Sequence, residues 1–201
     1  MTTRRLPALL SLLALGTLLA GCGIRATEVP TEYGPAPSRA RCASTPSDSR
    51  SESAGGVPVR VFLLCGSSLV AVDRTVRTPG GSEDSRRVLA AQALLDELAT
   101  PPSAAEQEAG YTSDVRETTV GGPRRGDPAD TLRLGTSPED LTSYALAQIV
   151  CTFSDSAAAE DEGSVVLGGP GTEEPLRYTC TDEVRARPGG NEPPSGRVTG
   201  G

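Results

Sequence analysis

Few residues of this 201-residue chain are of the types that carry out catalysis. It contains no histidine, and all 19 of its basic residues are arginines. Ser-His-Asp, Cys-His, Ser-Lys and Schiff-base arrangements therefore cannot form. Three pairs of adjacent acids remain: Asp96-Glu97, Asp161-Glu162 and Glu173-Glu174. They fall on an expected exposed helix face or in loops, so we interpret them as solvated charge. We expect no catalytic residue and no enzymatic activity.

The first 21 residues have the three-part layout of a secretory signal. Arg4 and Arg5 form a positive start, and the stretch 6–20 is uncharged and rich in Leu and Ala. This stretch is shorter than the roughly 20 apolar residues that a membrane-spanning helix needs. Residues 1–21 are therefore expected to be a signal peptide. The sequence leaves open whether export follows the Sec or the Tat route.

The cysteine at the end of this signal has the clearest chemistry in the chain. The tetrapeptide Leu19-Ala20-Gly21-Cys22 resembles a lipobox. In that motif the cysteine thiol receives a diacylglycerol, and a signal peptidase then cuts between Gly21 and Cys22. Two or more acyl chains on one cysteine give a lasting membrane anchor. We therefore expect a lipoprotein anchored through Cys22 on the extracytoplasmic face of the cell membrane.

The charge of the mature chain limits its partners. Loss of Arg4 and Arg5 with the signal leaves 17 arginines against 26 acids, a formal charge of about −9. An acidic surface without lysine argues against nucleic acid and against an electrostatic grip on anionic lipid. The membrane contact is therefore expected to come from the covalent lipid alone.

Four cysteines remain after Cys22 is assigned to lipid. An even number in an exported chain indicates two disulfides, and the sequence alone allows three pairings. A zinc site is disfavoured because there is no histidine and no C-x-x-C pair. The acidic loop 155–162 lacks the spacing of a calcium-binding EF-hand. We expect no metal and no cofactor. The four cysteines are Cys42, Cys65, Cys151 and Cys180.

Composition divides the mature chain into three parts. Residues 22–56 are rich in Pro, Ser, Gly and charge, which predicts a flexible linker behind the lipid anchor. Residues 186–201 have the same composition and are expected to form a disordered C-terminal tail. Residues 57–185 are long enough for one ordinary domain.

The first half of this domain predicts a hairpin followed by a helix. Two apolar runs, Pro58–Leu64 and Leu69–Val76, flank a small-residue turn and indicate a β-hairpin. From Asp84 to Leu98 the apolar residues recur at helical spacing. Ser103 and Glu106 have the spacing of a capping box and predict a short helical turn. The expected buried stripe of the helix is Val88, Ala91, Leu95 and Leu98, with Leu94 beside it.

The second half predicts short strands and one more long helix. Strands are expected at residues 115–120 and 131–134. Ser137, followed by proline and two acids, predicts a helix that runs to about Phe153. A second hairpin is expected from residues 164–167 and 176–181 across a Gly168–Gly171 turn, which we interpret as a turn and not a phosphate loop. The whole order predicts an α+β fold, with two main helices packed on a mostly antiparallel sheet.

Several of these segments resemble a known family. The run VRVFLLCGSSLVAVDR, the segment ALLDELATPPSAAEQEAGYTSDV and the later LTSYALAQIVCTF are similar to the GerMN domain of sporulation, spore-germination and related envelope lipoproteins. The piece of this pattern that is best preserved is Ala147–Thr152. The matches are approximate elsewhere: the family's Gly-Pro is Thr100-Pro101 here, and its Gly-Leu is Gly110-Tyr111.

The resemblance carries implications for pairing and activity. The mature start, Cys22 to Thr27, is similar to that of GerMN-type lipoproteins from high-GC Gram-positive bacteria. These often carry one cysteine after the Gln-Ile-Val segment and another near the C-terminus. The resemblance thus implies a Cys151–Cys180 disulfide, which leaves Cys42 for Cys65. It also implies a non-catalytic domain of an envelope assembly.

Two hypotheses on function follow. In the first, the domain docks onto another envelope protein. In the alternative, it binds a peptidoglycan fragment, a glycan or a small ligand, although four Tyr, two Phe and no Trp offer few stacking platforms. Gln148 interrupts an apolar helix, and we interpret it as a core-edge amide bonded to backbone in preference to a ligand contact. We interpret the tripeptide Arg125-Gly126-Asp127 as a chance match to an adhesion motif.

Overall fold

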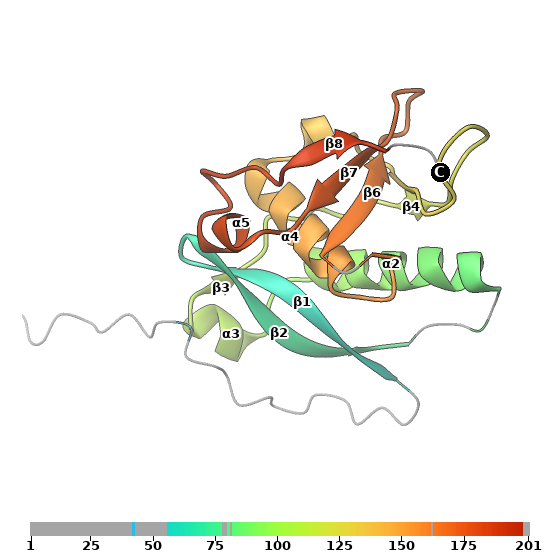
Figure 1. The fold of residues 1–201 in the computed structure, drawn as a ribbon. Helices are drawn as coiled ribbons and strands as arrows, with labels where there is room; N and C mark the ends of the chain where they lie inside the picture. Colours follow the sequence, from blue (N-terminus) through green and yellow to red (C-terminus); the bar gives the residue numbers. More distant parts are fainter. Residues whose placement is uncertain (1–41, 43–55, 78–79, 81, 162, 199–201) are drawn as a thin grey trace, which may run out of the picture. The chain divides into compact units, whose positions relative to one another are not determined.

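The computed structural model describes residues 42, 56–77, 80, 82–161 and 163–198, all within one compact unit, Arg39–Gly201. The expected signal peptide, Cys22 and nearly all of the expected linker lie outside the described residues. In the described part, two β-sheets combine with four α-helices (Figure 1). The predicted α+β class is confirmed, with the difference that the strands form two sheets.

The first sheet is built on the predicted hairpin. β1 (Val57–Cys65) and β2 (Ser68–Val76) pair antiparallel along their whole length. Gly66 has a φ of 61° in the two-residue turn between them, a conformation that glycine adopts without steric cost. The short β3 (Tyr111–Thr112) pairs with the end of β1 on the other side, so the strand order is β2-β1-β3.

The helices that follow the hairpin agree with the sequence patterns. α2 (Glu83–Ala99) begins after Ser82, whose side chain accepts a hydrogen bond from the Ser85 N–H. α3 (Ala104–Glu108) carries the expected capping box. The predicted stripe of α2 faces the core, with Val88 half-buried at its start and these residues fully buried: Ala91, Leu94, Leu95 and Leu98.

The second sheet has the order β4-β5-β6-β7-β8. Its pairing is antiparallel except between β5 and β6, which are parallel. The strand expected at residues 115–120 is reduced to its last residue, whereas β5 and the β6–β7 hairpin lie where the sequence predicts them. The strands are β4 (Val120–Gly121), β5 (Leu132–Leu134), β6 (Ser164–Gly168), β7 (Leu176–Thr179) and β8 (Ser195–Arg197).

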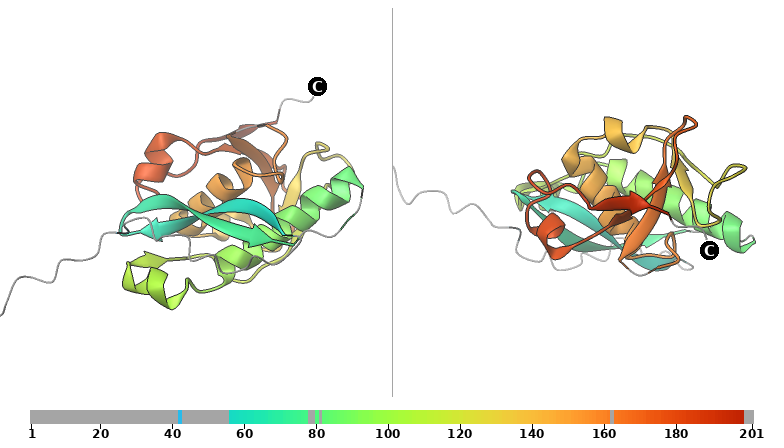
Figure 2. Two further views of the ribbon diagram at one scale, coloured as in Figure 1. Left: turned by 90° about the horizontal axis from the view of Figure 1, so that it is seen from below. Right: turned by 45° about the horizontal axis from the view of Figure 1, so that its top comes forward.

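α4 (Ser143–Ser154) is the centre of the fold. It packs on β1, on β6 and β7, and on α2 (Figure 2). Because it is enclosed on several sides, every residue from Ala145 to Ser154 is buried. A helix that is apolar over most of its circumference is expected in such a position.

The predicted start of this helix at Ser137 is wrong. Residues Pro138–Asp140 form a single 3-10 turn, and Ser137 makes no capping hydrogen bond. Leu141 is then extended, with φ −78° and ψ 150°, and this interrupts the helical path. α4 begins after Thr142, whose hydroxyl accepts a hydrogen bond from the Ala145 N–H at 3.1 Å. The serine–proline signal therefore marks a turn that precedes the helix.

The C-terminal segment differs from the tail expected over residues 186–201. α5 (Asp182–Ala186) is followed by a loop in which the Asn191 side chain donates to the carbonyls of Glu183 and Arg187. β8 then pairs antiparallel with β7. All three residues of β8 are exposed, so it adds backbone pairing at the edge of the sheet without an apolar pattern that the sequence could reveal.

Candidate functional site

One edge of β1 is closed by a helix in place of a strand. β3 pairs only with Leu64 and Cys65. Two residues before Leu64, the backbone N–H of Phe62 donates to Thr152 Oγ1 at 3.0 Å, and the Phe62 carbonyl accepts from Gln148 Nε2 at 2.9 Å. Gln148 and Thr152 are one turn apart on α4 and so face the strand together. They satisfy the edge groups that a neighbouring strand would otherwise pair.

Gln148 joins three segments of the chain. Besides Phe62, its Oε1 accepts from the Asp114 N–H at 2.8 Å, and its Nε2 lies 3.3 Å from Ser113 Oγ. The prediction of an amide bonded to backbone is confirmed, but the side chain is 0% exposed and lies inside the core, not at its edge. The Ala147–Thr152 pattern thus has a structural explanation: it places two polar groups against a strand edge.

Gln148→Ala is expected to lower the free energy of unfolding by about 2–4 kcal/mol. The substitution leaves the buried Phe62 carbonyl without its partner, which costs about 1–3 kcal/mol. It also removes the partner of the half-buried Asp114 N–H, which water replaces in part, at a cost of about 1 kcal/mol. Urea unfolding of the purified mature chain measures the difference.

Gln92→Ala is the matched control for this measurement. Gln92, on α2, bridges the Val120 N–H and the Thr118 carbonyl in the same way. It is only half-buried, so water can replace its amide and the expected loss is about 1 kcal/mol. Equal losses for the two variants would contradict the role assigned to Gln148.

Beyond Phe62, the same edge of β1 opens into a groove. Its two walls are residues 57–60 of β1 and residues 154–161, which end α4 and form the loop after it, and its volume is about 550 Å³. Backbone groups in an antiparallel pair alternate between the two edges of a strand, so Arg60 turns its N–H and C=O to the same side as Phe62. Among the described residues, no hydrogen bond reaches these two groups of Arg60.

The groove is lined by more acids than bases. Arg60 is the one base among its described lining residues, against Asp155, Glu160 and Asp161. Arg60 Nη2 lies 2.7 Å from Asp155 Oδ1. The other oxygen, Asp155 Oδ2, is buried and has no hydrogen-bond partner within the described part of the chain. The groove therefore combines open backbone groups with an acidic wall.

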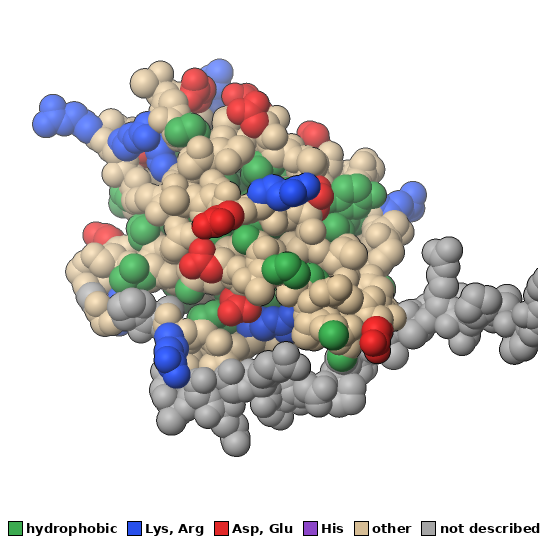
Figure 3. All heavy atoms as spheres, turned by 180° about the vertical axis from the view of Figure 1, so that it is seen from behind, with side chains coloured by type: hydrophobic (Ala, Val, Ile, Leu, Met, Phe, Trp, Pro, Cys, Tyr) green, Lys and Arg blue, Asp and Glu red, His purple; other side chains and the backbone are tan. Residues whose placement is uncertain are grey.

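The surface elsewhere carries charges of both signs. On the face that Figure 3 shows, acidic and basic side chains lie near one another, with hydrophobic side chains scattered between them. Among the described residues the large hydrophobic side chains that are exposed are Val57 and Tyr144, at 47% and 37%. Val57 lines the groove, so this region combines an exposed apolar side chain with polar groups that have no partner among the described residues.

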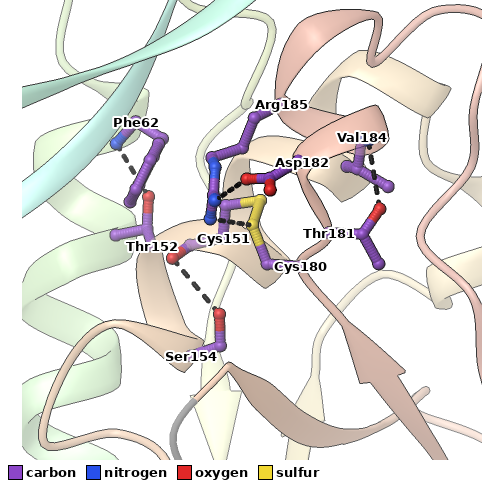
Figure 4. Close-up of a disulfide and its surroundings, with 9 residues drawn as sticks. All are labelled: Phe62, Cys151, Thr152, Ser154, Cys180, Thr181, Asp182, Val184 and Arg185. Carbon is purple, nitrogen blue, oxygen red and sulfur yellow. Dashed lines mark hydrogen bonds and ion pairs between the residues drawn. A yellow bond between two sulfur atoms is a disulfide. The ribbon is translucent and has the colours of Figure 1, made fainter.

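Two disulfides are present, in the pairs that the family resemblance implies. Cys151 on α4 is bonded to Cys180 just after β7, and the pair is packed against Val184 of α5 (Figure 4). Cys42 is bonded to Cys65 at the end of β1. Cys151 is fully buried, whereas Cys42 and Cys65 are half-buried. The expected presence of disulfide bonds thus agrees with the structure.

A buried ion pair holds the β6–β7 turn. Arg133 on β5 makes two hydrogen bonds to Asp127, at 2.6 and 2.8 Å, with side-chain exposures of 6% and 7%. Its guanidinium also donates to the carbonyls of Gly169, Gly171 and Glu173. Hydrogen bonding to Arg133 lowers the pKa of Asp127, although burial of the carboxyl acts in the opposite direction. Gly169–Gly171 thus lie in the connection of the predicted β6–β7 hairpin, while Gly168 is the last residue of β6. Asp127 of the Arg-Gly-Asp tripeptide is bonded to Arg133.

The adjacent acids Asp96 and Glu97 turn to different partners. Asp96 accepts from Gln92 on the same helix, whereas Glu97 turns to Arg74 at 3.6 Å, and burial raises the pKa of Glu97. Asp161 pairs with Arg177, and Glu162 lies outside the described residues. In the described part of the chain there is no group of three or more possible metal ligands and no helix long and apolar enough to cross a membrane.

Comparisons with known proteins give no relative: no family model, curated protein or solved structure matches the chain. The GerMN resemblance therefore stays a prediction. Sequence reasoning missed both the groove and the Arg133 cluster. Their residues are brought together from distant segments, and the only local signal was an arginine inside a short apolar strand.

Proposed function

We propose that this chain is a non-catalytic envelope lipoprotein, anchored through acylated Cys22 on the extracytoplasmic face of the cell membrane. Its α+β domain, a GerMN-like module, docks onto another envelope protein. The observation that carries this proposal is the tetrapeptide Leu19–Cys22 at the end of an apolar signal. The two disulfides support it, because such bonds persist in oxidising compartments outside the cytosol.

The position of the Cys42–Cys65 bond supports docking, because the bond sets where the segment after Cys22 is attached to the fold. Only 19 residues separate Cys22 from Cys42, whereas 34 separate Cys22 from Val57. The bond therefore limits the fully extended link between lipid and fold to about 70 Å instead of about 120 Å. It attaches the link at the hairpin turn, while the groove lies at the opposite end of β1. A partner can thus bind at the end of β1 that is remote from the attachment point.

The anchor and the partner can be tested in one experiment. The tagged chain is expressed in its native host as wild type and as Cys22→Ser. The wild type is expected to begin at Cys22 and to carry the added mass of a diacylglycerol, since the thiol is the acyl acceptor. Cys22→Ser is expected to lose this mass and to keep residues 1–21. Intact mass spectrometry measures both, with Cys42→Ser as a control that retains the lipid.

Chemical crosslinking of the same membranes tests docking. The wild type is expected to recover one envelope protein reproducibly, because the anchor holds the domain at a high local concentration beside its partner. An unmodified wild-type cysteine would refute the anchor. Retention on purified cell wall without any specific protein crosslink would refute docking and favour the glycan-binding alternative.

A further inference from the structure

We propose that the groove beside β1 receives an extended, basic segment of the partner protein, which pairs as an added strand with the open edge of β1. This inference rests on the docking function proposed above and names the surface that performs it. Adding a strand to an exposed sheet edge is a recurrent mode of peptide recognition, in which backbone hydrogen bonds supply affinity and neighbouring side chains supply specificity.

The backbone groups on the edge of β1 that faces away from β2 bond to different elements along the strand. At Leu64 and Cys65 it pairs with β3, and at Phe62 it bonds to side chains of α4. Both contacts use the outward backbone groups of alternate residues. The next outward residue is Arg60, where α4 has ended and the loop after it bends away to form the second wall of the groove. The groove therefore begins where the internal pairing of this edge stops.

The end of α4 explains why the edge is left open. Its last residue is Ser154, and Asp155 at the C-cap is no longer helical. Asp155 reaches Arg60 through its side chain alone. Gln148 and Thr152, in the preceding turns of α4, bond to the backbone of β1. Asp155 instead places a carboxylate beside the side chain of Arg60. An added strand would supply the N–H and C=O that Arg60 lacks among the described residues.

The acidic wall selects a basic occupant. Asp155 Oδ2 is an acceptor without a partner among the described residues. Glu160 and Asp161 are 50% and 66% exposed and pair with Arg87 and Arg177. Each of these two arginines also contacts a second acid, so the acids outnumber the bases on this wall. Val57, which lines the groove and is 47% exposed, provides an apolar contact. An extended segment with alternating apolar and arginine or lysine side chains complements both features.

Two variants at Arg60 separate the backbone from the side chain. Arg60→Ala and Arg60→Pro lose the same ion pair with Asp155, but only the proline removes the outward N–H. Proline is tolerated on an open strand edge, and far-UV circular dichroism with thermal unfolding checks that both variants fold. A photo-crosslinking amino acid at position 57 detects a protein segment bound in the groove. The same amino acid at exposed position 108, in place of Glu108 on α3, is the control.

The expected result is a crosslink from position 57, not from 108, to a basic partner segment that mass spectrometry identifies. Its yield is expected to fall at least about fivefold from Arg60→Ala to Arg60→Pro, since the loss of one buried donor leaves its acceptor unpaired. Should Arg60→Pro fail to fold, the exposed Ala157 in the opposite wall gives a second pair. Ala157→Arg is expected to lower the yield and Ala157→Glu to preserve it.

The outcomes separate the two proposals. Absence of any partner crosslink from either position, together with no partner in the membrane crosslinking, overturns docking and with it this inference. A reproducible partner whose crosslink from position 57 is equal in Arg60→Ala and Arg60→Pro, or in both Ala157 variants, overturns only the inference. A crosslink from position 57 to residues 43–55 of this chain would mean that the protein fills its own groove, which also overturns it.

Discussion

Asp127→Ala is expected to lower the free energy of unfolding by about 3–5 kcal/mol, the range observed when one partner of a buried ion pair is removed. The reason is Arg133, which is 6% exposed and whose pKa is raised by its hydrogen bonds to Asp127. It stays charged in the variant without its carboxylate. The carbonyls of the β6–β7 turn that it holds solvate a guanidinium only in part. Chemical unfolding of the mature chain at neutral pH measures the loss.

Asp182→Ala is the matched control. Asp182 also pairs with an arginine, Arg185, but its side chain is 87% exposed. Exposed pairs of this kind contribute about 0–1 kcal/mol. A loss for Asp127→Ala that is no larger than the loss for Asp182→Ala would show that water, not Asp127, balances the charge of Arg133.

The pH dependence gives a second measure of the same pair. Hydrogen bonding to Arg133 lowers the pKa of Asp127 below the ordinary value of 3.8. A carboxyl with a lowered folded-state pKa stabilises fully above its unfolded-state pKa and loses this contribution as the pH falls through the folded-state pKa. The difference in unfolding free energy between wild type and Asp127→Asn is therefore expected to be constant at neutral pH and to shrink below pH 3.8. A difference that grows in acid would contradict the assignment.

The elements that the sequence predicted are those with a local signal. The β1–β2 hairpin follows from two β-branched runs around a short turn, and α2 follows from its apolar spacing. The start of α4 was misplaced because Ser137 and Pro138 carry a genuine helix-start signal, but only one 3-10 turn forms before the extended Leu141. β8 was missed because its residues are all exposed and carry no apolar pattern, while the pairing with β7 depends on the fold.

The candidate site was missed for a different reason. Arg60 and Asp155 are 95 residues apart, and the groove between their segments depends on where α4 ends relative to β1. No spacing within a sequence window reports such a distance. Gln148 was predicted only in part. The sequence shows a polar residue inside an apolar helix, but its contact with Phe62, 86 residues away, depends on the fold. The cysteine pairing was implied by the resemblance and not by any local pattern.

Replacing Cys151 and Cys180 together with alanine is expected to destabilise the folded domain by about 3–4 kcal/mol. In the chain-entropy model this value follows from the loop that the bond closes, here with a sequence separation of 29. The Cys42–Cys65 bond has a separation of 23, so the same model predicts a nearly equal loss for Cys42→Ala with Cys65→Ala. The two double variants are therefore a matched pair.

Packing is expected to separate the two variants. Cys151 is 0% exposed and belongs to a cluster with Phe62, Ala147 and Val184, so its truncation also removes buried contacts, whereas Cys42 and Cys65 are half-buried. The variant that lacks the Cys151–Cys180 bond should unfold at a lower urea concentration than the variant that lacks Cys42–Cys65. Equal midpoints would show that the buried sulfur of Cys151 adds no packing energy. Loss of both bonds would remove about 6–8 kcal/mol, which is comparable to the whole stability of an ordinary domain. The reduced chain is then expected to be largely unfolded.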